Sequence, residues 1–180
     1  MAPLGILLYG LLATVSAWPC SVFLARHPNF QGTLLQRLGT RLPEVPAGRK
    51  VVWVHAASVG EVKAVAGLLG AVREHAPDHF VCMSCMTATG RAVASRLEGV
   101  DLVMAVPFDT PKAMRRHMLR LMPHVLIIVE TEIWPSMIRA ARRLGIPVVI
   151  VNARMSERAH RRYRRVAEVL GHVLSDVSVL

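Results

Sequence analysis

Residues 51–61 read Val-Val-Trp-Val-His-Ala-Ala-Ser-Val-Gly-Glu, and this stretch decides the fold that the sequence predicts. Its first five residues form an apolar run of the length of a buried strand, and the small residues after them are typical of a tight turn. Apolar residues from Val62 to Leu69 then recur at helical spacing. The stretch therefore predicts strand, turn and helix, with Glu61 at the carboxyl end of a strand, where open α/β sheets bind ligands.

A second acidic turn follows another apolar run in the same way. Residues 125–129 predict a strand, and Glu130-Thr-Glu-Ile-Trp-Pro135 comes directly after it. Glu130 is expected to project into the crevice, and Pro135 is suited to begin a helix. Two carboxylate-bearing strand ends in one small domain indicate catalysis, in which a carboxylate acts as general base toward a hydroxyl. Taken alone, stabilisation of a helix N-terminus explains Glu61 slightly better and Glu130 equally well.

Strands and helices alternate from residue 50 onward. Further apolar runs predict strands at Phe80–Ser84, Leu102–Ala105 and Pro147–Val151, with helical patterns between them. Wholly apolar strands that alternate with helices predict an α/β fold, a parallel sheet with helices on both faces. Residues 177–180 are expected to begin another strand, so we expect the chain to be a piece of a longer protein.

The first 25 residues carry no charged side chain. A membrane-spanning helix needs about 20 apolar residues, and a monotopic helix that lies on the membrane is the alternative. Arginines follow in residues 26–49, and positive charge beside an anchor indicates the cytoplasmic side. We therefore predict a membrane anchor at residues 1–25, a basic juxtamembrane connector at 26–49 and a cytoplasmic domain at 50–180.

The composition indicates an anionic partner. The chain has 22 Lys and Arg against 12 Asp and Glu, a net charge of +10. Such a balance favours phosphate-bearing partners, which include nucleic acid, anionic lipid and phosphorylated sugar. No run interleaves aromatic residues with arginine as a surface for single-stranded nucleic acid would, so nucleic acid is not the expected partner. Cys82 and Cys85 have the spacing of half a zinc site, but no second pair completes it, and we expect no metal.

Two other turns carry groups suited to binding anions. Thr87-Ala-Thr-Gly90 offers hydroxyl and backbone N–H groups at a helix start, either as an anion cradle or as ordinary capping. Asn152-Ala-Arg-Met-Ser-Glu-Arg158 lies at the next strand end, before a further arginine-rich segment. Arginine binds phosphate in a bidentate manner, which fits a phosphorylated acceptor. His55 and His124 stand alone in the sequence and are expected to be structural.

Together these motifs resemble those of the Kdo transferases, the 3-deoxy-D-manno-octulosonic acid transferases of lipopolysaccharide synthesis. The resemblance covers nearly the whole chain and rests on residues 55–61, 87–90, 130–135 and 152–158, on Arg162-Tyr163, and on a connector-like segment at 31–39. Ser136 departs from the family pattern, which often has Asn after Trp-Pro.

The resemblance implies the Rossmann-like N-terminal half of a GT-B glycosyltransferase at the inner membrane. This half would bind lipid A precursor (lipid IVA), while CMP-Kdo would bind a C-terminal domain. Glu61 would be the proton acceptor in an inverting transfer, and Glu130 would stabilise the transition state. No metal or cofactor is implied. The residues implied in substrate binding are Ser58, Gly60, Thr87, Thr89, Gly90, Asn152 and Arg154.

Because the CMP-Kdo domain is absent from these 180 residues, we expect the chain alone to be inactive. The alternative comes from a different functional class. It is a non-catalytic, membrane-bound module that binds anionic lipid or a separate donor-domain partner.

Overall fold

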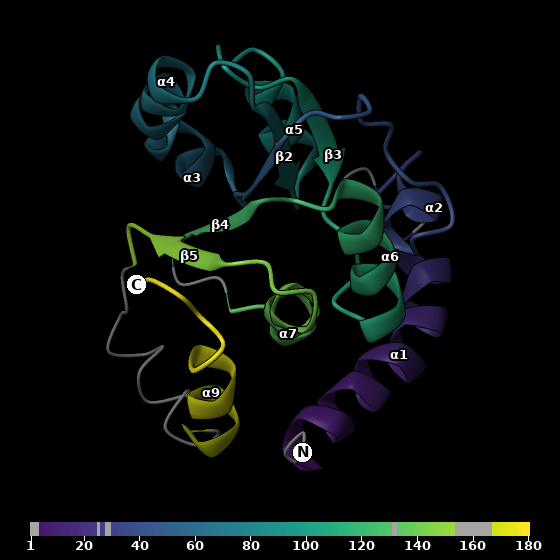
Figure 1. Ribbon diagram of the computed structural model, residues 1–180. Coiled ribbons are helices and arrows are strands. Elements are labelled where there is room, and N and C mark those ends of the chain that lie inside the picture. Colours follow the sequence, from purple (N-terminus) through teal and green to yellow (C-terminus); the bar gives the residue numbers. More distant parts are fainter. Residues whose placement is uncertain (1–3, 25, 28–29, 131–132, 154–166) are drawn as a thin grey trace.

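The computed structural model describes residues 4–24, 26–27, 30–130, 133–153 and 167–180. Five parallel strands form the central sheet in the order β3-β2-β1-β4-β5 (Figure 1). All the predicted apolar runs are strands, so the predicted parallel α/β sheet is confirmed. The strands are β1 (Val51–His55), β2 (Phe80–Cys85), β3 (Leu102–Ala105), β4 (Val125–Val129) and β5 (Val148–Val151).

Helices connect the strands, because parallel neighbours can be joined only by a crossover connection. The chain moves from β1 outward to β2 and β3, and then returns to place β4 and β5 on the other side of β1. Helices α3 to α5 therefore cover one face of the sheet, and α6, α7 and α9 lie on the other (Figure 1). These helices are α3 (Val59–Ala64), α4 (Ala66–His75), α5 (Ala88–Ala94), α6 (Pro111–Leu121), α7 (Pro135–Arg143) and α9 (Ala167–Leu174).

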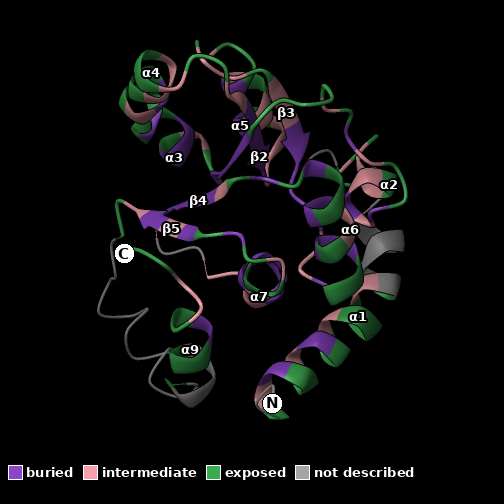
Figure 2. Cartoon of the chain, viewed as in Figure 1, coloured by how far each residue is buried: buried purple, intermediate pink, exposed green. Residues whose placement is uncertain are grey.

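Two hydrophobic cores lie on the two faces of the sheet, because successive strand residues point to opposite sides. Trp53 of β1 is fully buried in one core together with Met118 of α6. Val54, the next residue, is fully buried in the other core with Leu69 of α4. The strands are buried on both sides in consequence (Figure 2), which explains why their sequences are apolar throughout.

Helix α1 (Leu4–Leu24) contacts the domain through Ile6, Tyr9 and Gly10. Ile6 is part of the core, and Gly10 approaches α6 so closely that an added Cβ would lie 2.9 Å from Pro111 Cγ. Another side of the helix, from Leu4 to Val15, carries exposed apolar residues (Figure 2). In the described part of the chain, no helix has the length and apolar character needed to cross a membrane. The anchor at residues 1–25 stays a prediction.

Three details differ from or complete the predicted pattern. The helix expected from Val62 onward is two helices, α3 and α4, with Val65 outside helical geometry between them. Val65 is buried, so the break keeps an apolar side chain on the sheet. Where a strand start is expected at residues 177–180, the structure has an isolated parallel bridge between Val149 and Val179, outside the five named strands. The arginine-rich segment after Asn152 falls on residues 154–166, outside the described residues.

Candidate active site

The two acidic turns lie where the direction of the strand order reverses. β1 pairs with β4 in parallel, and His55 is level with Ile128. The chain leaves β1 toward β2 on one side, whereas it leaves β4 toward β5 on the other. Helices that follow such neighbouring strands lie on opposite faces, which opens a crevice at the carboxyl ends, the usual ligand site of open α/β sheets. Glu61 comes after β1, and Glu130 comes after β4.

Glu61 is held by a reciprocal set of hydrogen bonds at the start of α3. Its backbone N–H donates to Ser58 Oγ at 3.3 Å, and Ser58 is the N-cap residue. The Glu61 carboxylate accepts from the Ala57 N–H at 2.6 Å and from the Ser58 hydroxyl at 2.8 Å. This is a variant of the capping box, signalled in the sequence by Ser followed three residues later by Glu, in which the carboxylate accepts the N–H of Ala57, one residue before the N-cap. Glu61 is buried, so these donors fix its carboxylate at the end of β1.

Glu130 occupies a backbone conformation that few side chains adopt. Its φ is +61°, in the left-handed region, and its N–H donates to the Val151 carbonyl oxygen at 2.8 Å. Left-handed geometry is uncommon outside glycine, asparagine and aspartate, and it costs free energy unless the surroundings impose it. Glu130 is half-buried. Thr131 and Glu132, which follow it, lie outside the described residues.

The Thr87–Gly90 turn lies against the turn that carries Glu61. Thr87 caps α5, with its Oγ1 accepting the Gly90 N–H at 2.9 Å, as expected for ordinary capping. A Cβ on Gly90 would meet this Oγ1 at 2.9 Å and the Ala57 carbonyl oxygen at 3.8 Å. The Met86 N–H donates to the same carbonyl oxygen at 3.3 Å. Glycine at position 90 therefore leaves room for the Thr87 cap, while the Ala57 carbonyl oxygen is at an ordinary contact distance.

The remaining predicted site residues are exposed or lie outside the described residues. Ser58, Gly60 and Thr89 are exposed on the two turns. Asn152 directly follows β5, is exposed and has a left-handed φ of +54°. It is thus at the same edge of the sheet as both glutamates. Arg154 lies outside the described residues.

His55 at the end of β1 is more closely integrated into this edge than its isolation in the sequence suggested. It is fully buried, and its Nδ1 lies 3.0 Å from Ser84 Oγ, which accepts a 2.9 Å hydrogen bond from Trp53 Nε1. Its ring meets Trp134, four residues after Glu130, edge to face at 5.3 Å. Burial lowers the pKa of His55 to about 4. The imidazole is therefore neutral at physiological pH, which fits the expected structural role.

Arg37 is a buried cation that sequence reasoning missed. Arg37 is the last residue of helix α2 (Leu34–Arg37) and has no exposed surface. Its guanidinium donates to the carbonyl oxygens of Met86 at 2.6 Å and Val106 at 3.0 Å, next to the ends of β2 and β3. Burial, and to a smaller extent the charge of Arg91, lowers its pKa to about 10. A basic connector residue thus helps to build the carboxyl edge, although no local pattern distinguishes it from a solvated arginine.

The cysteines and other donor groups do not form a metal site in the described ranges, where no three His, Cys, Asp or Glu side chains come together. Cys82 and Cys85 are buried and free. Burial raises the pKa of the Cys85 thiol to about 12 and also raises that of Cys82. Both are therefore protonated at neutral pH, which makes them poor metal ligands and poor nucleophiles.

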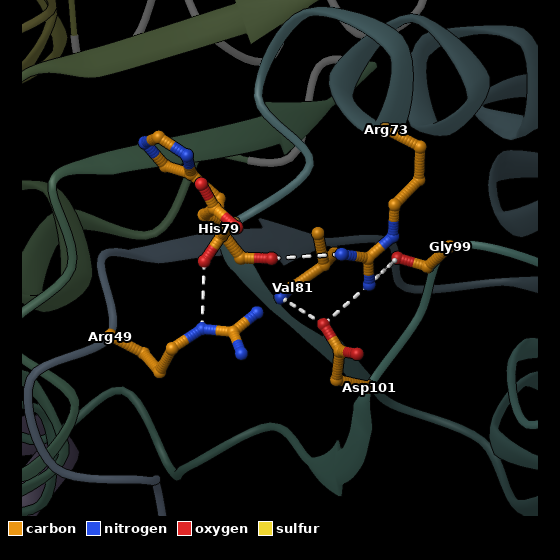
Figure 3. Close-up of polar contacts among 7 residues, drawn as sticks. Arg49, Arg73, His79, Val81, Gly99 and Asp101 are labelled. Atoms are coloured by element: carbon orange, nitrogen blue, oxygen red, sulfur yellow. Dashed lines mark hydrogen bonds and ion pairs between the residues drawn. The ribbon is translucent and has the colours of Figure 1, made fainter.

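The amino edge of the sheet, by contrast, is held by structural contacts (Figure 3). Arg73 donates to the His79 and Gly99 carbonyl oxygens at 2.8 and 3.0 Å. It also pairs with Asp101, whose carboxylate accepts the Val81 N–H at 2.7 Å. A cavity of about 360 Å³ opens beside this network. The cavity lies at the opposite edge of the sheet from Glu61 and Glu130. The Arg73 and Asp101 contacts beside it join the segments that lead into β2 and β3, and they therefore align these two strands.

Comparison with known proteins agrees with these motifs. Residues 33–180 match the family model described as 3-deoxy-D-manno-octulosonic-acid transferase (kdotransferase). The chain is 35% identical over 147 residues to the 3-deoxy-D-manno-octulosonic acid transferase of Bordetella pertussis, covering 78% of this chain and 33% of that protein. It is 29% identical over 156 residues to that of Haemophilus influenzae, covering 86% and 36%.

A plant relative shows the same pattern. The probable mitochondrial 3-deoxy-D-manno-octulosonic acid transferase of Arabidopsis thaliana is 33% identical over 129 residues, covering 71% of this chain and 29% of that protein. The chain thus spans about a third of the length of these curated relatives. Because the family match extends over most of the chain, the chain belongs to the 3-deoxy-D-manno-octulosonic-acid transferase family, as a region that corresponds to its N-terminal domain.

Proposed function

We propose that this chain is the acceptor-binding N-terminal domain of a glycosyltransferase that moves Kdo from CMP-Kdo to lipid A precursor. One observation carries the proposal. Glu61 and Glu130 follow β1 and β4, the adjacent strands between which the strand order reverses. This arrangement puts two carboxylates at the crevice where an α/β sheet binds its ligand.

In the proposed reaction, the Glu61 carboxylate takes the proton of an acceptor sugar hydroxyl. The hydroxyl oxygen forms a bond to the anomeric carbon of Kdo, and the bond from that carbon to CMP breaks with its electrons leaving on CMP. Attack opposite the leaving group inverts the anomeric carbon. Positive charge that develops on the Kdo ring is stabilised by the carboxylate of Glu130, since electrostatic stabilisation of the transition state is a major term in catalysis.

The capping box around Glu61 is compatible with this role. Each carboxylate oxygen accepts one hydrogen bond from the protein, and a carboxylate offers about four acceptor positions. An acceptor hydroxyl can therefore be bound while Ala57 and Ser58 keep the carboxylate oriented. Held in this way, the base loses little conformational freedom when the substrate binds, which favours reaction.

The acceptor is proposed to bind along the turns at this edge. The substrate-binding residues proposed there are Ser58, Gly60, Thr87, Thr89, Gly90, Asn152 and Arg154. The net charge of +10 suits an acceptor that carries phosphate. CMP-Kdo would bind a separate C-terminal domain, so this chain alone is proposed to lack transferase activity. The reaction needs no metal or cofactor in this scheme.

Attachment to the cytoplasmic side of the inner membrane completes the proposal. Leu4, Leu7, Leu8, Leu11 and Leu12 are all more than half exposed on one side of α1. Clusters of exposed apolar residues of this kind are rare on soluble monomers and mark interaction surfaces. A lipid surface would cover them and would bring the domain to its amphiphilic acceptor.

A transfer assay with CMP-Kdo and lipid A precursor tests the proposal, using this chain joined to a donor domain. Glu61→Gln is expected to lower kcat by about 10²- to 10⁴-fold, the usual effect of removing a general base. Asp101→Asn is the matched control, because it also removes a carboxylate bonded to one backbone N–H and one side chain, but at the amino edge. Transfer that survives Glu61→Gln unchanged would exclude Glu61 as the base.

A non-catalytic module that binds anionic lipid or a donor-domain partner is the second candidate. It is favoured by the capping box, which gives Glu61 a structural role by itself. Binding to anionic vesicles that persists in Glu61→Gln, together with no transfer after joining a donor domain, would support this candidate over the first.

A further inference from the structure

Asp109 lies where three helices meet, and the proposed reaction gives this residue no role. It stands between β3 and α6, one residue before Thr110, the N-cap of α6. Its carboxylate accepts the N–H groups of Ser136 at 3.1 Å and Met137 at 2.9 Å, in the first turn of α7. The same carboxylate accepts the Tyr9 hydroxyl of α1 at 2.7 Å. One side chain thus ties α1 and α7 to the start of α6.

The contacts with α7 act as a cap supplied from another part of the chain. The N-cap residue of α7, Trp134, makes no side-chain capping bond, so the first N–H groups of the helix need another acceptor. Asp109 supplies it, and a carboxylate at a helix N-terminus is also favoured by the helix dipole. Ser136 completes the contact by donating its hydroxyl to the Asp109 carbonyl oxygen at 2.8 Å. Ser136, the departure from the family pattern, is therefore integrated into this junction.

The start of α7 also bounds the turn that carries Glu130. Only four residues separate Glu130 from Pro135, the first residue of α7. The other side of the turn is fixed by the hydrogen bond from the Glu130 N–H to Val151. Glu130 keeps a left-handed φ of +61°, and strained conformations of this kind persist only where the surroundings impose them. The bond to Val151 and the first turn of α7 are both close to Glu130 along the chain, so a shift of that turn would alter the surroundings of Glu130.

We propose that Asp109 is a positioning residue for the Glu130 turn, and that the hydrogen bond from Tyr9 makes the docking of α1 part of that positioning. Transfer then depends on α1 being seated on the domain, apart from any contact of α1 with lipid. The role in transfer rests on the proposed function of Glu130, whereas the coupling between α1 and α7 does not. Burial raises the pKa of Asp109, and its three hydrogen bonds oppose the rise, so they favour its ionised form.

Hydrogen exchange in the 180-residue chain tests the coupling. Tyr9→Phe removes one hydroxyl, and we expect the Ser136 and Met137 amides to exchange about tenfold faster, the effect of losing a hydrogen bond to a charged group. Thr14→Val is the matched control, because it also removes one hydroxyl from α1, one that bonds only within the helix. Equal exchange rates in Tyr9→Phe and the wild type would overturn the coupling.

Kinetics of the chain joined to a donor domain test the positioning role. At saturating acceptor, Tyr9→Phe and Asp109→Ala should lower kcat with an unchanged KM for CMP-Kdo. The kcat of Asp109→Asn should lie between those of Asp109→Ala and the wild type, because the amide oxygen of asparagine can still accept a hydrogen bond. Faster exchange with an unchanged kcat would overturn the positioning role. If instead the wild type shows no transfer, the proposed function fails, and the exchange data still decide whether α1 and α7 are coupled.

Discussion

Acidification should destabilise the domain through His55 before most carboxylates are protonated. His55 is fully buried between Ser84 and Trp134, and its Nε2 has no hydrogen-bond partner among the described residues. Protonation would make the buried ring a cation, and its new Nε2–H group would have no hydrogen-bond acceptor among the described residues. The cost of burying that charge is the reason why the pKa falls from 6.5 to about 4.

The sign and size of the effect follow from linkage. The unfolded chain binds a proton at His55 near pH 6.5, and the folded chain binds it only near pH 4. Stability is therefore complete above pH 6.5 and is lost as the pH falls toward 4, because the unfolded state binds more protons in this window. At about 1.36 kcal/mol per pKa unit, the free energy of unfolding should fall by about 3 kcal/mol across it. This is a large fraction of the stability of a typical domain, about 5 to 15 kcal/mol.

Urea unfolding at several pH values, followed by tryptophan fluorescence, measures this loss. His55→Asn is the informative variant, because its amide can occupy the position of Nδ1 but does not titrate. We expect the variant to be less stable at pH 7 and to lose about 2 to 3 kcal/mol less than the wild type on acidification to pH 4. Burial also lowers the pKa of His117, but this contribution is common to both proteins and cancels in the difference. Parallel pH profiles for the two proteins would refute the reasoning.

Two further substitutions test contacts at the carboxyl edge. Gly90→Ala should lower the free energy of unfolding by about 1 kcal/mol, because its Cβ would displace the Thr87 cap. Gly67→Ala, in open space on α4, should raise the free energy of unfolding by about 0.5 to 1 kcal/mol. If thermal unfolding shows a change of the same sign in both variants, the close contact between a Cβ at position 90 and Thr87 Oγ1 is contradicted. Arg37→Lys should cost about 2 kcal/mol in urea unfolding, because an ammonium cannot reproduce the fork that binds two carbonyl oxygens. An unaltered midpoint would show that this fork contributes nothing.

The sheet could be predicted from the sequence because each strand is buried on both faces. Such strands appear as unbroken apolar runs, and Val51–His55, Leu102–Ala105 and Val125–Val129 begin and end where the sequence predicted. The break at Val65 could not be predicted, because the apolar pattern continues across it. Periodicity reports which side chains are buried, whereas a change of helix axis depends on how the two helices pack.

The candidate site was predictable only in its local parts. Glu61 and Glu130 were placed at strand ends from adjacent residues, and the structure puts those ends side by side. The capping box of Glu61 had a signal, Ser58 three residues earlier, that the prediction did not use. Arg37 bonds to Met86, 49 residues away, and Asp109 bonds to Ser136, 27 residues away. No pattern along the chain encodes such long-range partners, since they depend on tertiary packing.

The left-handed conformation of Glu130 has a consequence for how this position tolerates change. A non-glycine residue with positive φ gives up free energy that glycine or asparagine would largely recover. Selection for folding alone would thus drive position 130 away from glutamate, and selection for the proposed transfer role of Glu130 would retain it. A library of variants sorted separately for abundance and for activity should rank the residues at 130 in opposite orders. At a position that serves packing only, the two rankings should agree.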